Sequence, residues 1–285
     1  MEVARKADAE IVSLDAFQIY RGMDIGTAKP TWKERQEIPH HLLDLVQPEE
    51  SFSAADYKRA GEGVIAKLRS GNQRTIWVGG TGLYHRVMTQ GLSNAPRTDK
   101  KVSEQIETMG TEDMAAEVLR VDPEWAYQAD LRNRRRMVRA LAVWRQTGRT
   151  MSDWQKKGTA PGPLSGSRNY VLLPTMATLS QVIERRVRVM IKGGWIEEVR
   201  KLMECEGWVG APGRRAIGYD QVTMMIEGKM NQQEAYDKIV AETRAYAKRQ
   251  LTWFRGLPNF QAIETDSQLF PSQRMVEILV TALSE

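Results

Sequence analysis

Hydrophobic and polar positions along the chain predict strands that alternate with helices. The short apolar run Ile11-Val12 predicts a buried strand, and residues 75–78 predict a second one. Between them, from Ser53 to Gly71, apolar residues recur at helical spacing and Asp56 completes a start signal. Strands that alternate with helices favour an α/β fold with a parallel sheet.

The same alternation returns in the last part of the chain. Residues 170–173 predict a strand, and a helix containing Glu184 to Arg188 follows it. Asn231, with Glu234 three residues later, is a helix start signal, and the helical pattern continues to about Arg255. Residues 260–263 and 272–283 predict a last strand and a closing helix.

The stretch between residues 94 and 166 shows helical periodicity without strands. It begins at Asn94-Ala95-Pro96 and ends in a linker rich in proline and glycine, residues 160–166. We therefore expect an inserted all-helical domain at 94–166, and an α/β catalytic core made of residues 1–93 and 167–285.

Asp15 stands where the first predicted strand ends. Open parallel sheets hold their ligands at the carboxyl ends of the strands, so Asp15 is a catalytic candidate. Aspartate also caps turns, and its position alone leaves both roles open. The following segment, residues 20–30, contains two glycines, a proline and alternating charges, and it predicts a shaped loop.

Two other segments combine chemistry with an ordinary alternative. The turn Gly79-Gly80-Thr81-Gly82 could offer free amides and a hydroxyl to an anion, although glycine turns also serve tight packing. The predicted helix 133–147 buries an apolar side and carries an arginine stripe. The stripe consists of Arg132, Arg134, Arg135, Arg136 and Arg139. Such a stripe suits RNA phosphates, but many charge runs are solvated helix faces.

Composition sets limits on the function. Of 285 residues, 41% are hydrophobic, which is enough for a full core, and the net charge of +5 suits a polyanionic partner without requiring one. The single cysteine, Cys205, excludes a disulfide framework, and with three histidines leaves too few ligands for a zinc cluster. No apolar run of about 18 residues and no signal peptide occur, so we expect a cytoplasmic protein without a membrane partner.

Several segments resemble the tRNA dimethylallyltransferases, also called tRNA isopentenyltransferases. Residues 20–30, with Ser13 and Asp15 before them, match that family almost letter for letter. The resemblance continues through PHHLLD at 39–44, ESFSAAD at 50–56, GGTGLY at 79–84, AIGY at 216–219 and AKRQLTW at 247–253. It implies a P-loop NTPase-like parallel sheet core with a helical, tRNA-binding insertion.

The resemblance also implies an activity and a set of site residues. The family transfers a dimethylallyl group from dimethylallyl diphosphate to N6 of the adenosine 3′-adjacent to the anticodon of tRNA, with Mg²⁺ beside the diphosphate. Asp15 would accept a proton, and Arg186 would contact the diphosphate unless it is only a surface arginine. The residues that would contact tRNA are Asp15, Ala16, Phe17, Gln18, Thr81, Arg135, Arg136, Met137, Val138, Arg139, Arg215, Ala216, Ile217, Gly218, Tyr219, Arg244, Lys248 and Arg249. Tyr219 could equally be a core aromatic, and the metal ligands stay unknown. We expect a monomer that binds the anticodon stem-loop.

The chain departs from the family pattern at its start. The phosphate-binding sequence G-x-x-x-x-G-K-[ST] is absent, because Gly228-Lys229 lacks the first glycine and is followed by Met230. Aligned on Asp15, that loop and its strand would end shortly before Met1, so we expect a truncated gene model. Smaller departures are Ala16 in place of a serine, Ser103 in place of an arginine, and Asp130-Leu131-Arg132-Asn133 in place of His-Pro-Asn-Asp.

Three functions are therefore open. The first is the prenyltransferase, the second is a catalytically impaired tRNA-binding remnant, and the third is a small-molecule kinase of the P-loop class. The arginine stripes and the loop at residues 20–30 disfavour the kinase, because its chemistry needs neither.

Overall fold

A computed structural model describes residues 1–156, 160–257, 260–265 and 273–284. The chain forms two compact units, one made of Met1–Met88 with Gly166–Glu285 and the other of Thr89–Ser165. We describe each unit by itself. The predicted insertion, residues 94–166, is expected to bind tRNA, and this stays a prediction.

The first unit contains parallel strands. Strand β1 (Ala9–Ser13) lies between β2 (His40–His41) and β3 (Arg74–Val78), and both neighbours run parallel to it. A second pair, β4 (Asn169–Leu173) and β5 (Phe260–Glu264), is also parallel. Helices connect the parallel strands along the chain, as parallel pairing requires. This arrangement confirms the predicted α/β class.

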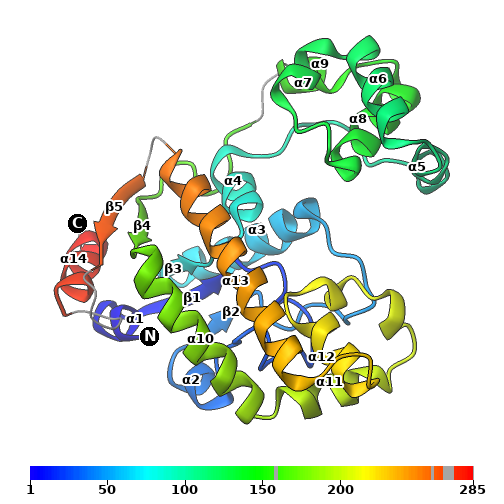
Figure 1. The fold of residues 1–285 in the computed structure, drawn as a ribbon. Coiled ribbons are helices and arrows are strands. Elements are labelled where there is room, and N and C mark those ends of the chain that lie inside the picture. The colour runs from blue at the N-terminus through cyan, green and yellow to red at the C-terminus, as the bar shows by residue number, and fades with distance from the viewer. Residues whose placement is uncertain (157–159, 258–259, 266–272, 285) are drawn as a thin grey trace. The chain divides into compact units, whose positions relative to one another are not determined.

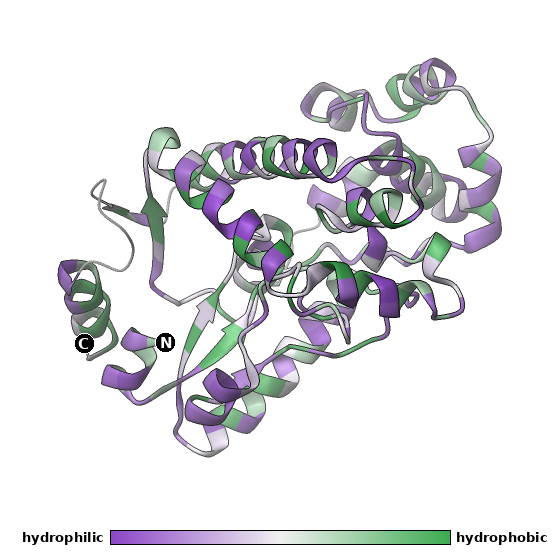
Figure 2. Cartoon of the chain, turned by 60° about the horizontal axis from the view of Figure 1, so that its bottom comes forward, coloured by the Kyte–Doolittle hydropathy of each residue, from purple (hydrophilic) through white to green (hydrophobic). Residues whose placement is uncertain are grey.

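The helices of the first unit surround these strands (Figure 1). They are α1 (Glu2–Ala7), α2 (Trp32–Glu37), α3 (Ala54–Ser70), α4 (Gly82–Gln90, which leads into the second unit), α10 (Met176–Lys192), α11 (Trp195–Met203), α12 (Tyr219–Ile226), α13 (Gln232–Arg255) and α14 (Gln273–Ser284), with 3₁₀ turns at Trp208–Gly210 and Gly213–Arg215. Helices α10 and α13 lie side by side. Hydrophilic and hydrophobic positions alternate along the helices, as one-sided burial predicts (Figure 2).

The helix start signals of the sequence are confirmed. Ser53 and Asp56 form a capping box at α3, and Asn231 and Glu234 form one at α13. Each box satisfies backbone amides that would otherwise lack partners. The buried side of α3 includes Gly61, a position that hydrophobicity alone would not place in a core. An added Cβ at Gly61 would lie 2.7 Å from Met88 Cε, so the helix packs closely there.

The largest core cluster of the first unit forms around Trp195 and Tyr219. Their ring centroids lie 5.7 Å apart at a steep angle, a favourable aromatic geometry. Glycines allow this close packing. A Cβ at Gly26 would lie 2.2 Å from Trp195 Nε1, and one at Gly218, where φ is +95°, would lie 2.1 Å from Trp195 Cη2. Trp195 thereby fixes the loop around Gly26 against α11.

The described residues of the second unit form helices and loops but no strand. Its helices are α5 (Lys100–Glu107), α6 (Thr111–Val121), α7 (Pro123–Gln128), α8 (Arg134–Thr147) and α9 (Met151–Lys156). Asn133 caps α8, so the predicted helix start at this position is confirmed. Buried Asp122 links α7 to α9, because its carboxylate accepts from the Trp125 amide and from the amide and hydroxyl of Ser152. Across the described part of the chain, no helix has both the length and the apolar character needed to span a bilayer.

Candidate active site

Asp15 directly follows β1, at the carboxyl end of the parallel strands. Its Oδ1 atom accepts from the amides of Phe17 (2.8 Å) and Gln18 (3.2 Å), so the aspartate caps its own turn. Its Oδ2 atom has no hydrogen bond to another described residue. The turn-capping alternative is therefore realised through one oxygen, while the other oxygen stays available for chemistry.

The turn from Gly79 to Gly82 lies beside Asp15. The Ala16 amide donates to Thr81 Oγ1 (3.1 Å), and the Thr81 amide donates to the Leu14 carbonyl (3.2 Å). The amide of Thr81 is thus already used by the protein. The expectation that the amides of this turn are free for an anion is wrong at Thr81, whereas its side chain is placed next to the catalytic candidate.

Packing explains the three glycines of this turn. An added Cβ at Gly79 would lie 2.3 Å from the Leu14 carbonyl oxygen, and one at Gly82 would lie 2.7 Å from the Trp253 ring. At Gly80 the space is taken by Gln250, whose Nε2 donates to the Gly80 carbonyl (3.0 Å). The packing alternative for these glycines is therefore the one observed.

Arg186 and three tyrosines complete the surroundings of Asp15. Arg186 extends from α10, and its side chain keeps some access to solvent although surrounding protein atoms partly enclose it. Burial lowers its pKa, and the charge of Asp15 acts in the opposite direction, which places the two groups within electrostatic reach of each other. The charges of the two predicted catalytic residues therefore influence each other, and their roles in catalysis stay predictions.

The tyrosines come from three further helices. Tyr57 and Tyr84 stack with centroids 3.8 Å apart, and the Tyr57 hydroxyl donates to the Ser13 carbonyl (2.6 Å). Burial raises the pKa of each, and the Asp15 charge adds to the shift. Burial and Asp15 also raise the pKa of Tyr246 on α13. Sequence reasoning did not identify these tyrosines as site residues. A signal was present on α13, where Tyr246 and Gln250 stand four positions apart and therefore share one helix face.

The loop after Asp15 is tied down by its own polar side chains. Gln18 Nε2 donates to the carbonyls of Thr27 and Ala28 (3.2 Å each), and Gln18 Oε1 accepts from Ser13 Oγ (2.8 Å). Half-buried Phe17 packs against the main core. Ala16, Phe17 and Gln18 therefore shape the turn that presents Asp15, and their contact with tRNA stays a prediction.

Lys29 anchors the end of the same loop. Its side chain is fully buried, and its ammonium group contacts Asp24 (2.6 Å), Asp44 (2.7 Å) and the Tyr20 carbonyl (2.7 Å). Three partners use all three donors of the ammonium group. Burial would raise the pKa of Asp44, but hydrogen bonds from Lys29 and Arg35 outweigh this effect and hold it below its usual value.

Five predicted tRNA contacts need correction because their side chains or backbones are buried. These are Met137, Val138, Ala216, Gly218 and Tyr219. Tyr219 is fully buried, and its hydroxyl donates to Glu198 (2.7 Å). The first two belong to the core of the second unit. Their burial does not fit direct contact with RNA, so we assign them packing roles; Ile217 is half-buried.

The predicted cations of the first unit divide into paired and exposed groups. Arg244 pairs with Glu184, whereas Lys248 and Arg215 are exposed. Arg249 is exposed and lies over the Tyr246 ring, 5.7 Å from its centroid. The side chains of Arg215, Lys248 and Arg249 thus present positive charge to solvent, as binding to RNA phosphates requires.

The arginine stripe of the second unit divides in the same way. Arg132 pairs with Asp130, Arg134 donates to Thr111 and two carbonyls, and Arg139 donates to the carbonyls of Pro96 (2.6 Å) and Ala95 (3.2 Å). Burial lowers the pKa of Arg139. Arg135 and Arg136 are exposed, and their side chains form no hydrogen bond or ion pair within the described residues. Only these two thus have free guanidinium groups.

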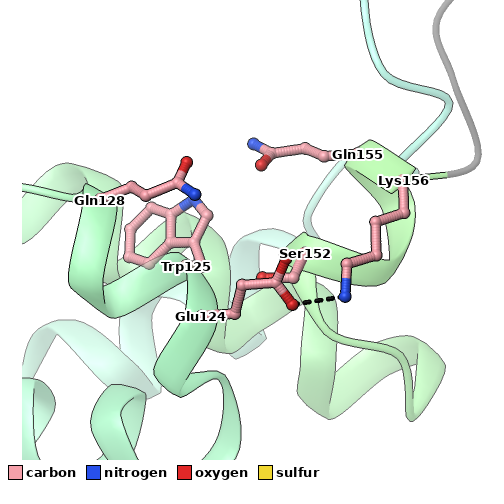
Figure 3. A pocket seen from close by; sticks show the side chains of 6 residues that line it. All are labelled: Glu124, Trp125, Gln128, Ser152, Gln155 and Lys156. Atoms are coloured by element: carbon pink, nitrogen blue, oxygen red, sulfur yellow. Dashed lines mark hydrogen bonds and ion pairs between the residues drawn. The ribbon is translucent and has the colours of Figure 1, made fainter.

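A hollow of about 250 Å³ also lies in the second unit. It is lined by Glu124, Trp125, Gln128, Ser152, Gln155 and Lys156. Figure 3 shows the ion pair between Glu124 and Lys156 at its rim. The hollow contains none of the predicted site residues.

Comparison with known proteins identifies the relatives of this chain. Residues 18–257 match the family model for IPP transferase. The tRNA dimethylallyltransferase 2 of Geotalea uraniireducens is 38% identical over 89% of this chain and 83% of its own length. Two solved tRNA isopentenylpyrophosphate transferases each cover 99% of this chain. The one from Bacillus halodurans (90% of its own chain covered) is 31% identical with a TM-score of 0.70, and the one from Staphylococcus epidermidis (92% covered) is 29% identical with a TM-score of 0.68. The chain belongs to the IPP transferase family.

Proposed function

We propose that this chain transfers a dimethylallyl group from dimethylallyl diphosphate to N6 of the adenosine 3′-adjacent to the anticodon of tRNA. Family membership supports the reaction class. The observation that carries the proposal is the free Oδ2 atom of Asp15, which stands at the carboxyl end of β1 within reach of the Arg186 charge. Because the proposed substrate is tRNA, we propose that the protein acts in the cytoplasm.

In this reaction a C–N bond forms and a C–O bond breaks. The electron pair of the C–O bond leaves with the diphosphate, while the N6 amine loses a proton. An aryl amine is a weak nucleophile, so a carboxylate that accepts this proton as the bond forms assists the step. Asp15 Oδ2 takes that role. The Oδ1 atom meanwhile keeps the turn fixed through the amides of Phe17 and Gln18.

The leaving diphosphate needs positive charge. Arg186 supplies a planar guanidinium group, which suits phosphate oxygens. No group of three metal-ligating side chains occurs among the described residues. Mg²⁺ usually binds through one or two carboxylates and substrate phosphates, so we propose that diphosphate oxygens supply most of its ligands. Bound in this way, Mg²⁺ would help to neutralise the leaving group.

The anticodon stem-loop is the proposed RNA partner. The target base has to leave its stack to reach Asp15, which costs a few kcal/mol. Phosphate contacts with the exposed cations of each unit offset this energy: Arg215, Lys248 and Arg249 in the first, and Arg135 and Arg136 in the second. We propose that the chain acts as a monomer.

A direct test uses the purified chain, dimethylallyl diphosphate, Mg²⁺ and a synthetic anticodon stem-loop. We expect mass spectrometry of the digested RNA to show one adenosine that has gained C₅H₈. A stem-loop with inosine at the target position lacks the N6 amine and should give no product. Binding of the stem-loop without product would favour the remnant alternative. The family match leaves no support for the kinase alternative, for which ATP-dependent phosphorylation would be the signature.

A further inference from the structure

Glu198 lies on α11, outside every segment that the sequence marks as functional. Its Oε2 atom accepts from the amides of Asp24 (2.8 Å) and Ile25 (2.6 Å), and its Oε1 atom accepts from the amide of Gly26 (3.2 Å). The Tyr219 hydroxyl donates to Oε1 as well (2.7 Å). One carboxylate thus gathers four donors, three of which are consecutive backbone amides.

The packing of α11 explains how Glu198 reaches this loop. Trp195, Val199 and Leu202 bury one side of the helix in the main core. Gly26 lies against the Trp195 ring so closely that no Cβ would fit, which brings the loop backbone next to α11. Hydrogen bonds to an ionised carboxylate are stronger than neutral ones, so Glu198 is a strong anchor for these amides.

The anchored amides are connected to the catalytic turn. The residues after Gly26 are Thr27 and Ala28, whose carbonyls accept from Gln18 Nε2. The Gln18 amide in turn donates to Asp15 Oδ1. A continuous path of hydrogen bonds and backbone therefore joins the Glu198 carboxylate to the aspartate that accepts the proton.

We propose that Glu198 is a positioning residue, which holds residues 24–28 so that Gln18 keeps the Asp15 turn in its productive geometry. The inference rests on the proposed function, because the geometry matters for catalysis only if Asp15 is the proton acceptor. Neighbouring Glu197 shares the first turn of α11, but it is exposed and its side chain makes no hydrogen bond to a described residue. It is therefore a matched control for charge near the helix start.

The first experiment measures hydrogen exchange of the amides at residues 24–26 in the full chain. In Glu198→Gln, the amide group offers one acceptor oxygen in place of two, and we expect these amides to exchange about tenfold faster or more. Glu197→Gln should match the wild type. Tyr219→Phe removes only the hydroxyl contact and should leave exchange at 24–26 nearly unchanged. This measurement needs no turnover, so it stands even if the proposed function fails.

The second experiment separates positioning from general stability. We expect Glu198→Gln to lower the single-turnover rate with the stem-loop by about tenfold, while the KM for dimethylallyl diphosphate changes less than about twofold. Unchanged exchange at residues 24–26 in Glu198→Gln would overturn the inference. So would an equal loss of exchange protection in Tyr219→Phe, or a fall in rate matched by an equal rise in the KM for the donor.

Discussion

The loop that follows β1 and the start of α8 are both rich in charged and polar residues, yet they use them differently. In the loop, the side chains of Gln18 and Lys29 form hydrogen bonds and ion pairs within the protein. At the start of α8, Arg135 and Arg136 extend into solvent without a partner among the described residues. The first region is fixed before any ligand arrives, whereas the second keeps its charge unused.

The proposed roles of the two regions account for this difference. A proton acceptor has to stand within hydrogen-bond reach of its target, so the residues around Asp15 gain from being locked by neighbours. Cations that bind an RNA backbone act by releasing counterions, and an arginine already paired to a carbonyl contributes little to that release. Side chains whose polar groups are paired within the protein therefore shape the surroundings of Asp15, and cations without a partner are the proposed RNA-binding residues.

Removing the buried charge of the loop should have the largest effect on stability. Lys29→Met removes a buried ammonium group that contacts Asp24 and Asp44, while Asp44 is partly exposed and keeps Arg35 as a partner, so we expect a loss of about 1.5 to 3 kcal/mol. We expect urea unfolding to show this loss. Lys33→Met, at an exposed position of α2, is the control and should change stability by less than about 0.5 kcal/mol. A loss below about 1 kcal/mol in Lys29→Met would show that the loop is not held by this cluster.

The same cluster predicts how stability depends on pH. The pKa of Asp44 is depressed in the folded chain, so its contribution to stability is present above its unfolded pKa, about 4, and is lost as pH falls through the lower folded value. The fall in unfolding free energy below about pH 4 should be shallower in Lys29→Met than in the wild type. Parallel pH profiles would exclude Lys29 as a source of the shift.

Asp15→Asn tests the catalytic half of the comparison. Asparagine keeps an Oδ1 atom that can accept from Phe17 and Gln18, so the turn should persist while the proton acceptor is lost. We expect the single-turnover prenylation rate to fall by about 10²-fold or more and stem-loop affinity to stay nearly unchanged. A wild-type rate in this variant would remove Asp15 from the mechanism.

Gly79→Ala tests whether the neighbouring turn is also fixed by packing. Its Cβ would meet the Leu14 backbone at 2.3 Å, and this overpacking should cost about 1 to 3 kcal/mol and displace Asp15. Gly63→Ala in α3 meets no atom within 4 Å, and it should stabilise the helix by about 0.5 to 1 kcal/mol. Thermal melts of both variants would settle the contrast, and a tolerated alanine at position 79 would contradict it.

The sequence predicted local features better than it predicted distant ones. The starts of α3, α8 and α13 follow from caps within three residues, such as Asn231 with Glu234. Asp15 was predicted from its place at the end of a strand, whereas Arg186 came from the family resemblance alone, and in the structure the charge of Asp15 acts on Arg186. Glu198 carried no local signal, because its partner Asp24 is 174 residues away in the chain. Tyr219 was ambiguous for the same reason, since only the tertiary packing decides whether its ring is buried.

The last prediction separates the used and unused arginines of α8. Arg135→Ala combined with Arg136→Ala removes two exposed cations, so the plot of log affinity against log salt should lose about 1.5 units of slope, and the melting temperature should stay the same. Arg139→Ala instead leaves the carbonyls of Ala95 and Pro96 without their donor and should destabilise the second unit by about 1 to 3 kcal/mol. Its salt slope should stay close to that of the wild type. Fluorescence anisotropy with a labelled stem-loop at several KCl concentrations, together with thermal melts, measures both quantities. If Arg139→Ala lowers the slope as much as the double variant, then arginines that the protein already pairs also bind phosphate, and the distinction between used and unused side chains does not identify the RNA surface.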